Sequence, residues 1–181
     1  MIDTPRHPIP EDLNNALAND FFIRFTVLGR RSGIPRTTES TFVWAPSISG
    51  DNQIFVSGYP GARDWVANAR ANPVATVHTV ENRVYYDIPA VARVITKRKE
   101  RTTPLLAFLS RWANRPGAEQ RVFGWLIMAI KMNSQLHLPW WGPFYLARRI
   151  MDQMPCVEFT FTGPAVPRDG FPPTPTSERG P

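Results

Sequence analysis

Short runs of β-branched and aromatic residues recur along the first half of the chain, and their spacing limits the folds that it can adopt. Turn-forming segments separate the runs, and one gap is long enough to hold a short helix. Such a series favours a small closed sheet of about six antiparallel strands over alternating strands and helices. The runs predict strands over residues 21–27, a stretch ending at residue 44, and residues 53–57, 74–80, 83–88 and 90–95, with a closing strand over 156–161.

Helical patterns occupy most of the remaining chain. Pro73 ends one of these runs, because proline disfavours the helical conformation of the residue before it. Thr103 and Pro104 form a typical helix start, with a hydroxyl cap followed by proline at the first helical position. The fold class predicted from these patterns is α+β, mainly β with α insertions. The expected helices cover about residues 11–19, 62–71, a segment from residue 103, 118–132 and a segment through residue 151.

The length of 181 residues is enough for one well-packed domain. We expect this domain over residues 1–162, with a helical insert at about 96–154 before the last strand. The Pro-rich segment 163–181 is expected to be disordered, because it cannot build a core. The lone Cys156 excludes an internal disulfide framework and fits a reducing cytoplasm, and the first twenty residues lack the apolar core of a signal peptide.

The segment between the first two predicted strands, residues 28–38, has the composition of a hairpin turn. Two glycines bracket its polar residues, which lets the backbone reverse at little steric cost. Arg30, Arg31 and Arg36 project from this corner, and a planar guanidinium suits phosphate and carboxylate groups. The residue types leave two interpretations open: a site for a polyanionic ligand, and a solvated hairpin tip.

The order of the residues adds a likeness to a known family. Leu-Gly-Arg-Arg-Ser-Gly-Ile-Pro-Arg-Thr-Thr at 28–38 is followed about 25 residues later by Gly-Ala-Arg-Asp-Trp-Val-Ala-Asn-Ala-Arg-Ala-Asn-Pro at 61–73. Together these motifs resemble the deazaflavin-dependent nitroreductase family, over roughly residues 20–95 and the last strand. The resemblance implies a split β-barrel opened by the first motif, with the second motif as a short helix over the ring of coenzyme F420.

The same resemblance implies the cofactor contacts. Arg31 and Arg36 are expected at the phosphate and the carboxylates of the cofactor, with Arg30 supporting them. The backbone from Ser57 to Gly61 is expected at the polar edge of the ring, since free N–H groups at a helix N-terminus favour carbonyl oxygens. The full set of predicted cofactor residues is Arg30, Arg31, Arg36, Thr38, Ser57, Gly58, Gly61, Arg63, Asp64 and Trp65. For Trp65, packing of the short helix against the core is the simpler interpretation. The alternative cofactor to F420 is FMN.

The substrate side is predicted from aromatic residues. Trp140, Trp141 and Tyr145 fall where the family places residues that cover the pocket, and stacking on a planar acceptor suits them. Filling the space between insert and barrel is the alternative. His137 lies beside the tryptophan pair and is the candidate proton donor, whereas His78 on a strand is interpreted as structural. The predicted pocket residues are therefore His137, Trp141 and Tyr145, and no metal site is expected because the histidines lack ligand spacing.

The positive charge belongs to the second half of the chain. Residues 1–90 hold 8 Lys and Arg against 9 Asp and Glu, whereas residues 91–181 hold 13 against 6. This distribution of charge does not indicate a nucleic-acid-binding module. The insert is basic and rich in tryptophan, which leaves three interpretations: core and dimer packing, a lid over the substrate pocket, or peripheral contact with an anionic membrane or a lipid-like substrate.

Together with the resemblance, these observations predict a cytoplasmic oxidoreductase of the split-barrel type that forms a homodimer, with peripheral membrane association left open. It is expected to pass hydride from reduced F420 to an unsaturated, nitro or quinone-like small-molecule acceptor. Two alternatives remain open: an enzyme of the same fold that uses FMN, and a non-catalytic carrier of a lipid or tetrapyrrole.

Overall fold

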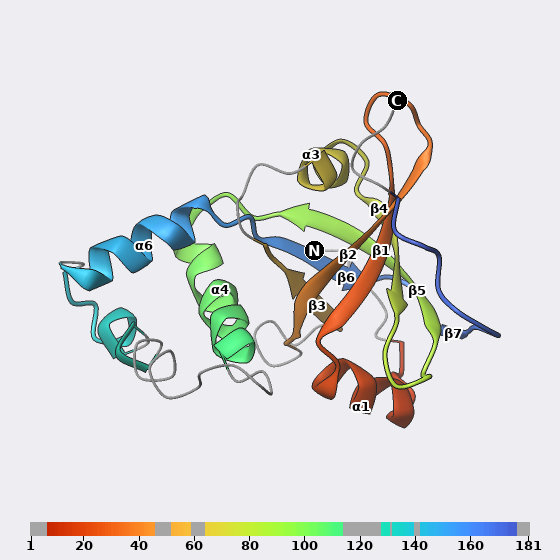
Figure 1. The fold of residues 1–181 in the computed structure, drawn as a ribbon, viewed down its shortest axis with the longest axis horizontal. Helices are drawn as coiled ribbons and strands as arrows, with labels where there is room; N and C mark the ends of the chain where they lie inside the picture. The colour runs from red at the N-terminus through yellow and green to blue at the C-terminus, as the bar shows by residue number, and fades with distance from the viewer. Residues whose placement is uncertain are drawn as a thin grey trace.

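The computed structural model describes residues 7–45, 52–58, 64–113, 128–130, 132–139 and 142–176. Six antiparallel strands form a closed barrel, because β4 pairs with both β1 and β5 and the order around the barrel is β1-β2-β3-β6-β5-β4 (Figure 1). This confirms the predicted split β-barrel of α+β class. The barrel strands are β1 (Phe22–Leu28), β2 (Pro35–Trp44), β3 (Gln53–Val56), β4 (Val74–Thr79), β5 (Tyr86–Val94) and β6 (Val157–Phe161).

Alternation along the strands fills the barrel interior with apolar side chains. In β1, Ile23, Phe25 and Val27 are buried while their neighbours are more exposed. The ring of Phe25 lies 4.9 Å from that of Phe159, between centroids, so opposite sides of the barrel meet at its centre. Burial of such rings supplies much of the free energy that stabilises a small barrel.

β5 corrects the prediction of two strands over 83–88 and 90–95. It is one strand with Pro89 inside it, paired with Thr76 of β4. The carbonyl of Pro89 accepts a hydrogen bond from the Thr162 backbone N–H at 2.9 Å, just beyond the end of β6. The nitrogen of Pro89 faces the same side, so its missing N–H removes no bond to β4.

Four helices are bounded along the described chain: α1 (Glu11–Asn19), α3 (Asp64–Ala71), α4 (Arg98–Ala113) and α6 (Pro143–Gln153). The predicted helix over 11–19 is confirmed by α1, which lies at one end of the barrel, whereas α3 lies near the other (Figure 1). Of the helix predicted over 118–132, residues 118–127 and 131 lie outside the described residues, and residues 128–130 and 132 are helical. No described helix is both long and apolar enough to cross a membrane.

α4 corrects the predicted helix start at Thr103. It begins at Arg98 and continues through Pro104, although proline inside a helix removes one backbone hydrogen bond. Leu105, Leu106 and Phe108 are buried against the outer face of the barrel. Their burial offsets the lost bond, so tertiary packing decides where this helix begins.

Arg111 ties the end of α4 to α1. Its guanidinium donates to the carbonyls of Ala18, at 3.0 Å, and of Asp20. It also lies 5.2 Å from the centroid of the Phe42 ring. Burial lowers the pKa of Arg111, and the neighbouring Asp20 carboxylate partly opposes this effect. One side chain therefore satisfies the C-terminal carbonyls of α1 and packs on the barrel.

The Pro-rich tail does not meet the expectation of disorder over residues 163–176. Its strand β7 (Val166–Pro167) pairs with the start of β5, beyond the reach of β6. Further along, the Arg24 guanidinium donates to the carbonyls of Pro172 and Pro173, at 3.2 and 3.1 Å. Prolines cannot build a core, but their carbonyls accept hydrogen bonds as well as any others, and this holds the extended tail on the barrel.

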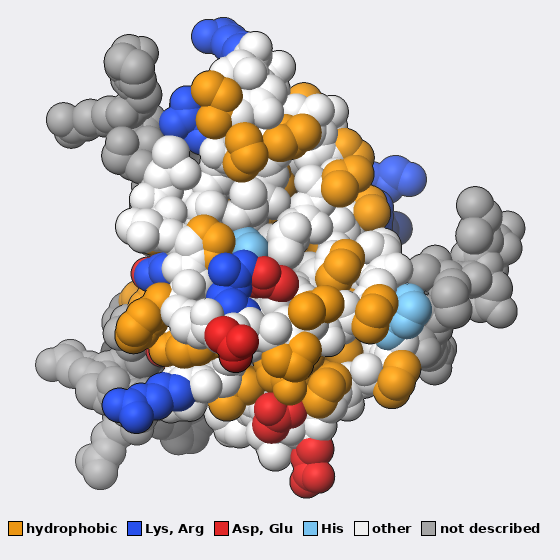
Figure 2. Space-filling model, turned by 90° about the vertical axis from the view of Figure 1, so that its right-hand side faces the viewer, with side chains coloured by type: hydrophobic (Ala, Val, Ile, Leu, Met, Phe, Trp, Pro, Cys, Tyr) orange, Lys and Arg blue, Asp and Glu red, His pale blue; other side chains and the backbone are white. Residues whose placement is uncertain are grey.

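Figure 2 shows the side of the molecule on the right of Figure 1, where β5 and β7 lie. Hydrophobic side chains are spread across it, and Lys and Arg side chains are scattered singly.

Candidate functional site

The β1–β2 hairpin presents the predicted arginines at an exposed tip. Its backbone reverses through bonds from the Gly29 N–H to the Ile34 carbonyl at 2.9 Å and from the Gly33 N–H to the Gly29 carbonyl at 2.8 Å. Gly33 has a φ of 66°, in the left-handed region that glycine adopts without strain. The predicted hairpin is therefore present, with its turn at the predicted glycines.

Arg30 joins the hairpin to α3. Its Nη2 lies 2.9 Å from Oδ1 of Asp64, and its backbone N–H donates to Oδ1 of Asn68 at 3.1 Å. Nη1 of Arg30 donates to the same Asn68 oxygen at 3.2 Å. Arg30 and Asp64, both predicted as cofactor residues, thus engage each other and fix the hairpin. Sequence reasoning missed Asn68, although a polar residue on the buried face of a short helix was a readable signal.

Arg31 and Arg36, unlike Arg30, are not held by α3. Arg31 is exposed and Arg36 is half-buried. Across the described residues, no ion pair or side-chain hydrogen bond engages either guanidinium. Two forked cationic donors are therefore available on a hairpin whose position is fixed by the third arginine.

One face of β2 leads from Arg36 toward the loop after β3. Arg36, Thr38 and Ser40 alternate along the strand and therefore point to the same side. The Ser40 hydroxyl donates to the carbonyl of Ser57 at 3.1 Å. Four residues of strand span roughly 13 Å at about 3.3 Å per residue. This polar path ends at Gly58, where an added Cβ would meet nothing within 4 Å, so the backbone there is open to a ligand.

The four remaining residues predicted at the cofactor differ in their surroundings. Ser57 is buried, and its hydroxyl donates to the Pro155 carbonyl at 2.6 Å, so its side chain holds β3 to the start of β6. Trp65 is only 6% exposed and packs edge-on against Phe25, with centroids 5.2 Å apart. Its burial agrees with the core-packing interpretation, and its contact with a cofactor stays a prediction. Gly61 and Arg63 lie outside the described residues.

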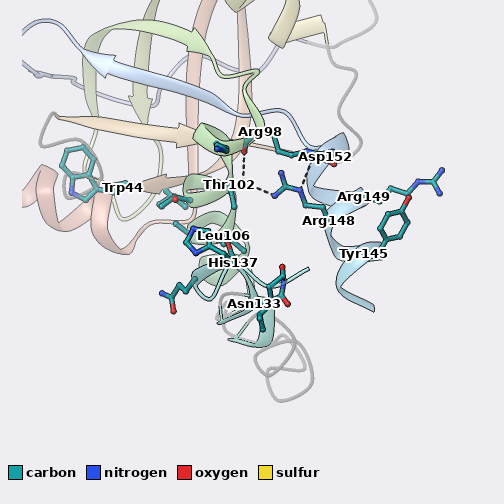
Figure 3. Close-up of a pocket in the computed structure, with 18 residues that line it drawn as sticks. Trp44, Arg98, Thr102, Leu106, Asn133, His137, Tyr145, Arg148, Arg149 and Asp152 are labelled. Atoms are coloured by element: carbon teal, nitrogen blue, oxygen red, sulfur yellow. Dashed lines mark hydrogen bonds and ion pairs between the residues drawn. The ribbon is translucent and has the colours of Figure 1, made fainter. Parts of the chain in front are cut away.

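The predicted pocket residues lie at the other end of β2. His137 and Tyr145 line a cavity of about 1210 Å³ between the end of β2, α4 and α6 (Figure 3). Tyr145 is 60% exposed, and Figure 3 shows it on the side of α6 away from Thr102, so it lies at the rim. Trp140 and Trp141 lie outside the described residues.

This cavity is separate from the arginine hairpin. It is lined by Val43 and Ala45, whose side chains belong to the cluster on the outer face of the barrel. Arg36 and Trp44 are eight residues apart on β2, which is roughly 26 Å of strand. The structure therefore places Arg36 and Thr38 on the face of β2 that leads to Gly58, with Arg31 on the turn before this strand, and it places His137 and Tyr145 in a second region.

His78 has the structural surroundings predicted for it. Its Nδ1 lies 2.6 Å from Oδ1 of Asp87, and its Nε2 lies 2.9 Å from the hydroxyl of Thr26. Burial lowers the pKa of His78, and the hydrogen bond to Asp87 opposes this effect. Arg168 of the tail pairs with the same carboxylate, so this histidine belongs to a polar network under the tail.

Comparison with known proteins bears on the fold. The sequence matches no protein-family profile and no curated protein. Among solved structures, the conserved hypothetical protein Rv2991 from Mycobacterium tuberculosis superposes with a TM-score of 0.55 and 10% identity, over 88% of this chain and 85% of that one. The protein Atu2129 of unknown function from Agrobacterium tumefaciens gives 0.55 and 15%, over 92% and 60%.

The chain has a split β-barrel fold. A structure titled F420 Reductase is also similar, at a TM-score of 0.49 and 12% identity, over 87% of this chain and 98% of that one. Because the identities to the Rv2991 and Atu2129 structures are below 25%, those likenesses bear on the fold alone. The function has to be argued from the residues of the site.

Proposed function

We propose that this split-barrel protein is an oxidoreductase that uses coenzyme F420 and passes hydride from it to an unsaturated, nitro or quinone-like acceptor. The observation that carries the proposal is the pair of arginines, Arg31 and Arg36, without an engaging partner among the described residues, on a hairpin fixed by Arg30. The two motifs that resemble the deazaflavin-dependent family include these same residues.

The residues present fit a long acidic cofactor. The guanidinium groups of Arg31 and Arg36 suit a phosphate, because arginine binds phosphate oxygens through two parallel N–H donors. The polar face of β2 then leads over roughly 13 Å to the open backbone at Gly58. Gly58 has no side chain, and an added Cβ would meet nothing within 4 Å, which suits close approach of a planar ring to the backbone.

The chemistry of the site divides between cofactor and protein. When bound, a deazaflavin supplies the hydride transfer itself. The chain's own residues hold and orient the cofactor. Arg31 and Arg36 bind its acidic end, and the contacts of Arg30 with Asp64 and Asn68 keep the hairpin in position. No nucleophile or metal ion is required of the protein for such a step.

Titration with oxidised F420, followed by its fluorescence, tests this assignment. The wild-type protein is expected to bind with a Kd in the micromolar range or below. Arg31→Glu combined with Arg36→Glu is expected to weaken binding about 100-fold or more, because two charge-assisted contacts become repulsive. Arg83→Glu combined with Lys97→Glu makes the same change in net charge at exposed positions away from the hairpin and is expected to leave the Kd unchanged.

An unchanged Kd in the hairpin double variant would remove the phosphate assignment. Parallel titration with FMN tests the choice of cofactor, since tighter binding of FMN would contradict it. Turnover of reduced F420 with nitro and quinone acceptors then separates an enzyme from a protein that only binds the cofactor.

A further inference from the structure

The cavity between β2, α4 and α6 is lined by an excess of positive charge, and these cations have no role in the proposed hydride transfer. Its described lining carries four cations, Arg98, Lys99, Arg148 and Arg149, against the single carboxylate of Asp152. Figure 3 shows Arg98, Arg148 and Asp152 together on one wall, where α4 and α6 face each other. A concave site with an excess of one charge concentrates ligands of the opposite charge.

Asp152 is shared among several arginines. It forms an ion pair with Arg98, lies 3.4 Å from Nε of Arg148 and lies 3.7 Å from Nη2 of Arg101. One carboxylate cannot neutralise three guanidinium groups. The described lining of the cavity therefore carries more positive than negative charge.

Two of these guanidinium groups are largely removed from water. The side chains of Arg148 and Arg101 are only 11% and 14% exposed. Burial lowers the pKa of Arg148, the Asp152 carboxylate partly opposes this, and Arg98 and Arg101 add to the lowering. The Thr102 hydroxyl accepts a hydrogen bond from Nη1 of Arg148 at 3.0 Å and holds this side chain toward α4. Buried and crowded cations of this kind are stabilised by an added anion.

An apolar strip adjoins the charged end of the cavity. Leu106 lies on the same face of α4 as Arg98 and Thr102, and it is buried together with Val43 of β2, while Ala107 and Leu138 also line the cavity. A cationic end continued by an apolar strip suits an amphiphile with an anionic head. At about 1210 Å³, the cavity is larger than most sites for small polar ions, so it has room for a chain as well as a head group.

We propose that this cavity binds a phosphate monoester that carries an apolar chain, with the phosphate between Arg98, Lys99 and Arg148 and the chain along Val43 and Leu106. A phosphate monoester bears a charge of about −1.5 to −2 at neutral pH, which matches a surplus of several positive charges better than a single carboxylate does. Arginine also matches the geometry of phosphate oxygens. The proposal does not depend on the cofactor assignment, because the two regions lie at opposite ends of β2.

Calorimetric titration with four probes tests the pocket: dodecyl phosphate, dodecanoate, dodecanol and inorganic phosphate, each below its micelle concentration. Dodecyl phosphate is expected to bind one site saturably and at least about 10-fold more tightly than dodecanoate or dodecanol. Inorganic phosphate is expected to compete weakly. Equal binding of dodecanol and dodecyl phosphate, or no saturable site for either, would overturn the proposal.

Variants locate the site. Arg98→Gln combined with Lys99→Gln is expected to weaken dodecyl phosphate at least about 10-fold, while Asp152 keeps Arg101 and Arg148 as partners. The matched control, Arg83→Gln combined with Lys97→Gln, removes the same charge elsewhere and is expected to have no effect. Unchanged affinity in the first pair would overturn the assignment.

A second variant separates a ligand site from an ion-pair network that only joins two helices. Asp152→Asn removes the competing carboxylate and is expected to tighten dodecyl phosphate several-fold, although it weakens the contacts between α4 and α6. Weaker binding in this variant, with the fold confirmed by circular dichroism, would overturn the proposal. So would binding to vesicles containing phosphatidate without binding to dissolved dodecyl phosphate, because the contact would then be a membrane surface.

Discussion

Five polar side chains on the outer face of the barrel form one chain of contacts, from Arg168 through Asp87 and His78 to Thr26 and Thr37. The two threonine hydroxyls lie 2.8 Å apart. Because each polar group in this chain has a partner, the network costs little to bury, and loss of one member leaves the next without its bond.

His78 should give the folding free energy a pH dependence of defined sign. Burial lowers its pKa in the folded protein, so the unfolded chain takes up the proton first as the pH falls. The free energy of unfolding is therefore expected to decrease below about pH 6.5, by up to about 1.4 kcal/mol per pH unit, and to level off below the folded-state pKa.

Urea unfolding between pH 5 and 7.5 measures this slope, and the variant His78→Gln is expected to flatten it. His7→Gln serves as the control, since His7 lies in the N-terminal segment outside this network. An unchanged slope in His78→Gln would show that other groups account for the pH dependence.

At the scale of elements, the C-terminal tail behaves as a strap across the barrel. β7 extends the sheet beside β5, and the Thr176 backbone N–H donates to the Thr37 carbonyl at 2.8 Å, while the Thr37 N–H donates to the Thr176 hydroxyl at 3.0 Å. The strap therefore crosses from β5 to β2 and covers the His78 network between them.

Arg168 is the charged anchor of this strap. Its Nε lies 2.9 Å from Oδ1 of Asp87, and both side chains are roughly 30% exposed. Arg168→Ala is expected to lower the free energy of unfolding by about 1 kcal/mol, because a partly exposed, two-pronged ion pair lies above the range of simple surface pairs. The neighbouring exposed Asp169→Ala is expected to change it by less than about 0.5 kcal/mol. Equal effects of the two variants in thermal or urea unfolding would argue against a structural strap.

At the scale of the whole molecule, the apolar residues form two separate clusters. One fills the barrel around Phe25 and Phe159, and the other lies between the outer face of the barrel and helices α4 and α6. The barrel cluster is surrounded by the six strands and also includes residues of α1 and α3, whereas the outer one is bordered by the open cavity. The two parts should therefore differ in local stability.

Hydrogen exchange measured by mass spectrometry tests this difference. Amides of β1 and β5 are expected to exchange slowest, at the rate of global unfolding, and amides of α6 at least about 10-fold faster. Addition of dodecyl phosphate is expected to slow exchange in α6 and leave β1 unchanged. Equal protection of β1 and α6 without ligand would indicate a single cooperative unit.

Features of the fold and the site could be predicted from the sequence where interactions between residues close in the chain determine them. The strands, α1 and the hairpin followed from alternation and turn residues, because side-chain periodicity and the conformational freedom of glycine act within a few residues. The place of Arg31 on the exposed turn and of Arg36 at the start of β2 could be predicted for the same reason.

Contacts between distant residues decided the rest. That Arg30 is engaged by Asp64 and Asn68 while Arg31 and Arg36 are not depends on how α3 packs beside the hairpin. α4 runs through Pro104, and the tail lies on the barrel, because burial and hydrogen bonds to distant strands outweigh local preference. The sequence by itself determined which segments became strands and where the cations are. Tertiary packing alone decided which cations remained available and which of them gathered at each end of β2, since side chains meet according to the arrangement of the strands and not their order in the chain.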